Sequence, residues 1–213
     1  MKKNLSAVLM EGVAEVARRN GVETGRYYHG PKHTAMVMVF VKDLGERAGV
    51  GSDGICRLVM DATWHDTEQS LGRVWNEKES ARLLGESMRR HGYTEEEIEE
   101  TVSLIPGTIV YWLEGVMHQQ AEGMDLLAKL LADADLCALG ARGDDFADMS
   151  LRLMAEFAGK PISEFTAEEV VAGWKNQVKF MTGRKFLTKE ANDLMGEQFL
   201  VNLKYARNMA GLE

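Results

Sequence analysis

The stretch ICRLVMDATWHD, residues 55–66, joins an apolar helical pattern to two adjacent ionisable side chains. Its apolar positions recur at spacings of three and four residues and lead to His65, so they share one face of a helix with that imidazole. Asp66 lies beside the same face. Burying a neutral polar group without a partner costs roughly 2–7 kcal/mol, and burying a charge costs more. A divalent cation removes this cost because it binds imidazole and carboxylate directly; the alternative is an ordinary helix end at the protein surface.

The composition is that of a folded globular protein. Of the 213 residues, 45% are hydrophobic and 27% are charged, which allows a sizeable core. The net charge of −8 disfavours binding to a nucleic-acid polymer, because such binding needs a basic stripe. It does not disfavour a small anionic substrate, which a local cluster of basic side chains can bind.

Cysteine usage and hydropathy indicate a cytoplasmic protein. Cys56 and Cys137 lie in apolar helical stretches, resemble small core residues and suggest no disulfide framework. No apolar run approaches the roughly 18–20 residues of a transmembrane helix. The apolar stretch at residues 5–10 is short and is followed by Glu11 and Glu15, so we expect an amphipathic helix there rather than a signal peptide.

The spacing of apolar residues predicts an all-α protein, a single domain of residues 1–213 with about eight to ten helices. Nearly every segment has the helical period, and three prolines interrupt the chain. The expected helices cover residues 5–19, 33–47, 53–65, 76–90, 94–105, 108–119, 121–139, 144–158, 166–182 and 188–209. Two of them begin with the pattern of a capping box, in which Asn76 pairs with Glu79 and Thr94 pairs with Glu97.

Two more of the expected helices carry an ionisable group on an apolar face. His33 begins the apolar face of helix 33–47, and Asp135 follows two leucines at spacings of four residues. Together with the His65-Asp66 pair, these helices offer two imidazoles and two carboxylates. Such a ligand set suits a divalent ion, namely Mn, Fe, Co, Ni, Zn or Mg.

Five short motifs also occur in a characteristic order. They are YHGPKHT at 28–34, ATWHD at 62–66, NEKESA at 76–81, IPGT at 105–108 and DADLCALG at 133–140. This order resembles the HD superfamily of metal-dependent phosphohydrolases, and most closely a bacterial branch of unassigned substrate. The similarity covers about residues 27 to 207 and includes Asn202-Leu203. It implies a helical bundle of the HD type with the ligand order His, His-Asp, Asp.

The resemblance implies a specific set of metal ligands. They are His33, His65, Asp66 and Asp135. Asp133 competes for the last place, but the family has the ligand directly before the leucine, so we expect Asp133 on the helix surface or behind the ligands. The branch usually has a histidine shortly after the position of Thr108, whereas residues 109–112 contain none. We therefore expect one divalent ion, with His91 and His118 as the candidates for a second site.

The resemblance further implies roles in catalysis and substrate binding. Asp66 would bind the ion and orient the nucleophile, Glu68 would act as general base or support a ligand, and His29 would donate a proton or bind phosphate. The candidates for phosphate binding are Lys32, Arg26 and Arg73. Each of these side chains could instead lie in solvent. Tyr27 and Tyr28 could stack on a base or, alternatively, pack between helices.

The sequence therefore predicts an enzyme, a metal-dependent hydrolase of a small phosphoester, with a nucleotide as one candidate. Its expected partner is this phosphorylated substrate, and it is expected to be a monomer or homodimer that binds no membrane. One alternative is a non-catalytic module that binds a metal ion or a nucleotide. Another is a di-iron oxygenase of the same scaffold, which needs more ligands than the resemblance supplies.

Overall fold

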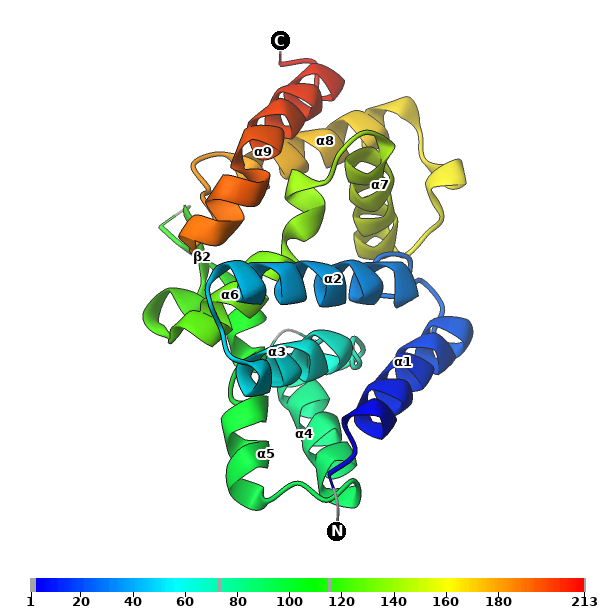
Figure 1. The fold of residues 1–213 in the computed structure, drawn as a ribbon. Helices are drawn as coiled ribbons and strands as arrows, with labels where there is room; N and C mark the ends of the chain where they lie inside the picture. The colour runs from blue at the N-terminus through cyan, green and yellow to red at the C-terminus, as the bar shows by residue number, and fades with distance from the viewer. Residues whose placement is uncertain (1–2, 73, 115, 213) are drawn as a thin grey trace.

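The computed structural model describes residues 3–72, 74–114 and 116–212, and in these ranges it has the predicted all-α fold (Figure 1). The α-helices are α1 (Leu5–Val22), α2 (Pro31–Arg47), α3 (Ser52–Trp64), α4 (Trp75–Arg90), α5 (Glu95–Val102), α6 (Leu126–Asp135), α7 (Asp144–Ala158), α8 (Ala167–Met181) and α9 (Lys189–Met209). Short 3₁₀ helices are η1 (Ile105–Thr108), η2 (Gln120–Gly123), η3 (Cys137–Gly140) and η4 (Ile162–Glu164). None of the helices in these ranges is long and apolar enough to cross a lipid bilayer.

Helix α2 lies at the centre of the molecule, with α1, α3, α4 and α5 on one side and α7, α8 and α9 on the other (Figure 1). One apolar cluster includes Leu44 of α2, Leu131 of α6 and Trp174 of α8. A second cluster includes Val8 of α1 and Trp64 of α3. Helices α2 and α3 pack side by side and run in opposite directions, so the start of α2 meets the end of α3.

The two predicted capping boxes have different outcomes. At the start of α5 the prediction is confirmed, because the Thr94 hydroxyl accepts from the Glu97 N–H (3.3 Å) and the Glu97 carboxylate accepts from the Thr94 N–H (3.0 Å). At the start of α4 the prediction is wrong. Asn76 lies inside the helix and is buried, and its Oδ1 accepts a hydrogen bond from the backbone N–H of Leu71 (2.9 Å). This amide closes the preceding loop rather than capping the helix.

The helix expected at residues 108–119 is also wrong. The structure has an antiparallel hairpin there, made of β1 (Val110–Leu113) and β2 (Val116–Gln119), and Tyr111 pairs with His118. Their rings stack with centroids 5.6 Å apart. Valine, tyrosine and tryptophan favour extended backbone, and cross-strand ring contacts stabilise it, so these local preferences outweigh the weak helical period.

The long helix expected at residues 121–139 is divided into three pieces. The 3₁₀ turn η2 comes first, the helix α6 follows, and η3 ends the segment. Asp125 causes the restart, because its side chain accepts a hydrogen bond from the Ala128 N–H (3.0 Å) and thereby caps α6. The helix consequently ends at Asp135, the predicted metal ligand.

Candidate metal centre

The four side chains that the sequence grouped as ligands come together in the structure. His33 lies in the first turn of α2, His65 caps the end of α3, Asp66 follows it, and Asp135 is the last residue of α6. One imidazole nitrogen or carboxylate oxygen from each lies within 4.8 Å of all the others. Both imidazoles are fully buried. Residues more than a hundred positions apart in the chain therefore share one small volume.

Nitrogen and oxygen atoms alternate in this cluster. The Nε2 atom of His33 lies 3.0 Å from an oxygen of Asp66 and 3.0 Å from an oxygen of Asp135. The Nε2 atom of His65 lies 2.9 Å and 3.2 Å from the same two oxygens. Ligand bonds of about 2.1 Å at right angles place neighbouring ligand atoms about 3.0 Å apart, whereas tetrahedral angles place them about 3.4 Å apart. The cluster thus fits neighbouring ligands of an octahedral divalent ion.

The charges of the cluster also call for a cation. Burial alone would lower the pKa of His65, but the negative charge of Asp66 and hydrogen bonds to Asp135 and Asp66 raise that pKa well above its ordinary value. Burial would raise the pKa of Asp66, and the facing imidazoles instead lower it well below its ordinary value. Two half-buried carboxylates need about two compensating positive charges. Two protonated imidazoles would supply them, and so would one divalent ion bound to neutral imidazoles.

Neighbouring groups orient the ligand atoms. The Nδ1 atom of His65 donates to the backbone oxygen of Ala62 (3.0 Å), which leaves the Nε2 lone pair directed at the cluster. The Gln69 side chain donates to one oxygen of Asp66 (2.9 Å). The other Asp66 oxygen is buried and faces the Nε2 atoms of both imidazoles. This arrangement, in which one atom of each ligand is left for the centre, is the one a bound metal ion requires.

His29 lies beside the cluster and is held there by a residue that the sequence did not reveal. Its Nε2 atom is 3.9 Å from an oxygen of Asp66, and its Nδ1 atom pairs with the carboxylate of Glu156 on α7. Glu156 also accepts hydrogen bonds from the backbone N–H groups of Tyr28 (2.6 Å) and His29 (3.1 Å). No local pattern marks Glu156, because its partners lie more than a hundred residues away.

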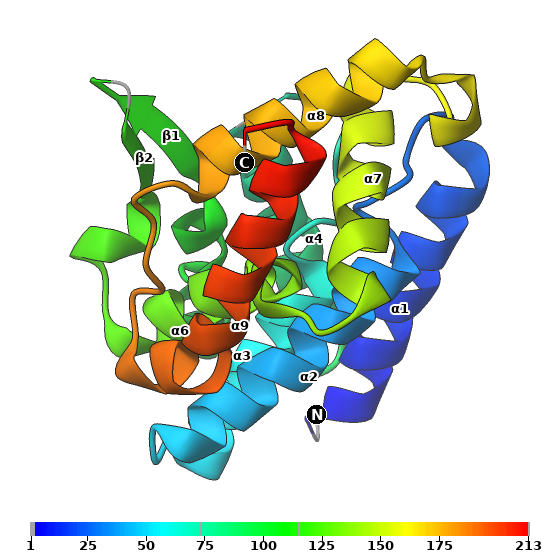
Figure 2. The same cartoon turned by 90° about the horizontal axis from the view of Figure 1, so that it is seen from above.

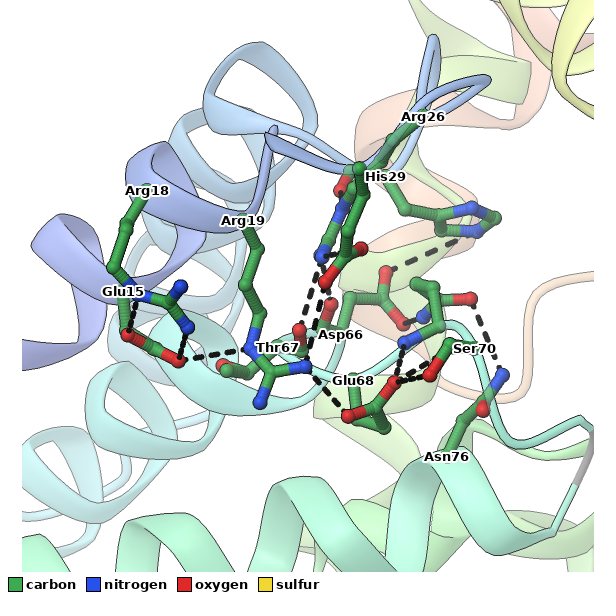
Figure 3. Close-up of polar contacts among 12 residues, drawn as sticks. Glu15, Arg18, Arg19, Arg26, His29, Asp66, Thr67, Glu68, Ser70 and Asn76 are labelled. Atoms are coloured by element: carbon green, nitrogen blue, oxygen red, sulfur yellow. Dashed lines mark hydrogen bonds and ion pairs between the residues drawn. The ribbon is translucent and has the colours of Figure 1, made fainter. Parts of the chain in front are cut away.

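Arg26 does not face the centre of the cluster, contrary to its predicted role in phosphate binding. Its guanidinium donates to the backbone oxygens of His29, Asp66 and Thr67 and to the carboxylate of Glu23 (Figure 3). The side chain is buried. Arg26 therefore fixes the backbone on which His29 and Asp66 are mounted, and it is a positioning residue.

Glu68 is likewise bound within its own loop. One oxygen accepts from Arg19 (2.5 Å), and the other accepts from the backbone N–H of Gln69 (3.0 Å) and from both donors of Ser70, as Figure 3 shows in part. Burial would raise the pKa of Glu68, but the donors of Ser70 and Arg19 lower it to about 2. A carboxylate with this pKa is a weak proton acceptor at neutral pH, so we do not assign Glu68 the role of general base.

The other phosphate candidates are not brought to the cluster. The Lys32 ammonium, on the exposed side of α2, pairs with Asp145 (2.8 Å) and Asp148 (3.0 Å) of α7. Arg73 lies outside the described residues. Tyr28 is buried and packs its ring 4.6 Å from that of His33, which agrees with the packing alternative.

Asp133 is a buried anchor, so the expectation of a helix-surface position is wrong. It accepts hydrogen bonds from the backbone N–H groups of Leu187 (2.7 Å) and Thr188 (2.8 Å) and thereby fixes the start of α9. The two candidates for a second metal site are also elsewhere. His91 pairs with a glutamate of α1 (2.8 Å), and His118 pairs with one of η2 (3.0 Å).

Glu77 is a further charged residue near the ligands. It lies in the first turn of α4, and its Oε2 atom is buried without a hydrogen-bond partner. Burial raises the pKa of Glu77, and the negative charges of Asp66 and Asp135 act in the same direction. A raised pKa makes this carboxylate a stronger proton acceptor than an ordinary glutamate. The signal for it is the NEKESA motif, in which the sequence pattern gives a structural role to Asn76 and Glu79 but not to Glu77.

Comparisons of the chain with models of protein families, with curated proteins and with solved structures find no match. The function must therefore be inferred from the side-chain cluster and from the motifs around it.

Proposed function

We propose that the protein is a metal-dependent phosphohydrolase of the HD type, which hydrolyses a small phosphoester such as a nucleotide. The alternation of two imidazole nitrogens and two carboxylate oxygens at 2.9–3.2 Å is the observation that carries this proposal. The order of the motifs along the chain supports the same family.

The residues present suit a divalent ion of the Mn, Fe, Co, Ni, Zn or Mg type. His33, His65, Asp66 and Asp135 would hold it, because each leaves one atom directed at the common centre. Bound there, the ion would lower the pKa of a water molecule and polarise a phosphoryl oxygen. In the described residues this is the single group of three or more side chains suited to a metal ion, which favours one ion over the two of a di-iron oxygenase.

The chain itself supplies the groups that move protons. His29 presents Nε2 toward Asp66 while Glu156 holds its other nitrogen, so Nε2 is the nitrogen positioned to exchange a proton with a reacting oxygen. Glu77 has an unpartnered oxygen and can accept a proton from an attacking water. Arg26 keeps the backbone of both His29 and Asp66 in place. Catalysis in this proposal thus depends on preorganised positions rather than on a mobile element.

The test is a metal analysis followed by a substrate screen. Protein purified without chelator should contain about one divalent ion per chain and should release phosphate from at least one phosphoester in a broad panel with that metal. His65→Ala and Asp66→Asn should abolish both properties. His118→Ala is the matched control, because this imidazole lies on β2 and pairs with Glu122 of η2, and both properties should be retained.

Two results would overturn the proposal. Protein that binds no divalent ion with His33, His65, Asp66 and Asp135 intact would remove its basis. Stoichiometric metal and tight nucleotide binding without turnover on the whole panel would instead identify the non-catalytic module.

A further inference from the structure

Arg184 belongs to the segment between α8 and α9, which runs beside α6 (Figure 2). Asp133 of α6 fixes the end of this segment through the backbone of Leu187 and Thr188. Asp133 precedes the ligand Asp135 by two positions on the same helix. The anchor therefore holds the segment that carries Arg184 next to the end of α6 where the ligand lies.

The guanidinium of Arg184 is largely enclosed by apolar groups. Its central carbon lies 4.7 Å from the ring centroid of Phe180, and Nη2 contacts the sulfur of Met117 on β2. The Nε and Nη1 atoms are buried and have no hydrogen-bond partner. No salt bridge to a carboxylate is formed among the described residues. A buried donor without a partner destabilises the folded protein, and more strongly when it is charged.

The charge of Arg184 is nevertheless retained. Burial lowers the pKa of Arg184 to about 10, which keeps the side chain protonated at neutral pH. Among the opposing negative charges, that of Asp135 has the largest effect, followed by those of Asp133 and Glu122. Unsatisfied donors, full charge and closeness to a metal ligand are together the properties of an oxyanion receptor.

We propose that Arg184 binds a phosphoryl oxygen of the substrate held at the metal centre. This inference rests on the proposed phosphohydrolase function and adds its phosphate-binding residue. It replaces Arg26 and Lys32, whose donors are already used by backbone oxygens and by surface carboxylates. The ligand class is a phosphate oxyanion, which would supply the acceptors that Nε and Nη1 lack.

A structural role for Arg184 predicts a different outcome from a binding role. If the guanidinium held the hairpin against α8, Arg184→Met would lower the melting temperature. If the guanidinium instead binds an oxyanion of the substrate, Arg184→Met removes a buried cation that has no partner in the free protein. The melting temperature should then stay the same or rise. Arg82→Met is the matched control, because Arg82 is an exposed arginine on α4 that pairs with glutamates.

The experiment titrates inorganic phosphate into wild type, Arg184→Met, Arg184→Lys and Arg82→Met by calorimetry, each with and without bound Mn²⁺. We expect Arg184→Met to bind phosphate at least about tenfold more weakly at unchanged Mn²⁺ affinity. Arg184→Lys should recover part of the loss, and Arg82→Met should match wild type. In turnover, Arg184→Met should raise KM for a phosphomonoester.

The outcomes separate this inference from the function on which it rests. Equal phosphate affinity in wild type and Arg184→Met overturns the role of Arg184 and leaves the phosphohydrolase proposal intact. A lower melting temperature with unchanged phosphate affinity assigns Arg184 to packing and overturns the inference as well. If wild type binds no Mn²⁺, the phosphohydrolase proposal fails. The phosphate titration without metal then tests whether Arg184 forms an anion-binding site. If wild type binds phosphate and Arg184→Met does not, the anion-binding role of Arg184 is supported. If wild type binds no phosphate, that role is overturned.

Discussion

Replacing Arg26 with methionine should disorder the proposed metal centre, although none of the four candidate ligands is replaced. The guanidinium donates to three backbone oxygens, those of His29, Asp66 and Thr67. A hydrogen bond from a charged donor contributes about 1.5–3 kcal/mol, and water can replace part of what three lost bonds remove. We therefore expect Arg26→Met to lower the free energy of unfolding by about 3–5 kcal/mol. Because Asp66 shifts with its backbone, the affinity for the divalent ion should fall about 10–100-fold.

Urea unfolding monitored by circular dichroism measures the first effect, and calorimetric titration with Mn²⁺ measures the second. Arg26→Lys should be almost as damaging, because one ammonium group cannot reach three carbonyl oxygens. Arg18→Met serves as control, since Arg18 is exposed and pairs within its own helix with Glu15, and it should change stability by less than about 0.5 kcal/mol. Wild-type stability and metal affinity in Arg26→Met would refute the positioning role.

Three further predictions concern pH, anchoring and metal binding. Burial acts to raise the pKa of Glu11, but hydrogen bonds from three side chains at the end of α4 lower it from 4.5 to about 2. Glu11→Gln should therefore cost about 1 kcal/mol at pH 7, and thermal melts should show this difference shrinking between pH 4.5 and 2 as the wild-type carboxylate is protonated. Asp133→Ala removes the anchor of residues 187–188 and should lower stability by about 2–4 kcal/mol in urea unfolding; a loss below about 0.5 kcal/mol would contradict it. Mn²⁺ at a hundred times its Kd should stabilise wild type by about 2.7 kcal/mol and His65→Ala hardly at all, and equal stabilisation would place the ion elsewhere.

The four side chains of the cluster could be predicted from the sequence because their signal is local. His33, His65 and Asp135 each interrupt an otherwise apolar helical face, and an ionisable group in such a position needs a partner. The boundaries of α7 could also be predicted, since residues 144–158 have a clear helical period and glycines at both ends. These features depend on neighbours within a few turns of the same helix.

The features that sequence analysis missed depend on distant partners. The roles of Arg26 and Glu68 are set by loop carbonyls and by Arg19, which no spacing rule relates to them. Glu156 of α7 holds His29, and Arg184 in the segment after α8 carries a charge on which Asp135 acts, and both lie far along the chain from these partners. The hairpin at residues 110–119 is different, because its valines and aromatic residues favour a strand and could have been recognised from composition.

The most direct test of a shared metal centre is a crystal structure of the Mn²⁺-loaded protein with anomalous diffraction measured at the manganese edge. We predict one anomalous peak within about 2.0–2.3 Å of the Nε2 atoms of His33 and His65 and of one oxygen each of Asp66 and Asp135. A map without a peak among these atoms, in which the two imidazoles only form ion pairs with the two carboxylates, would contradict the account.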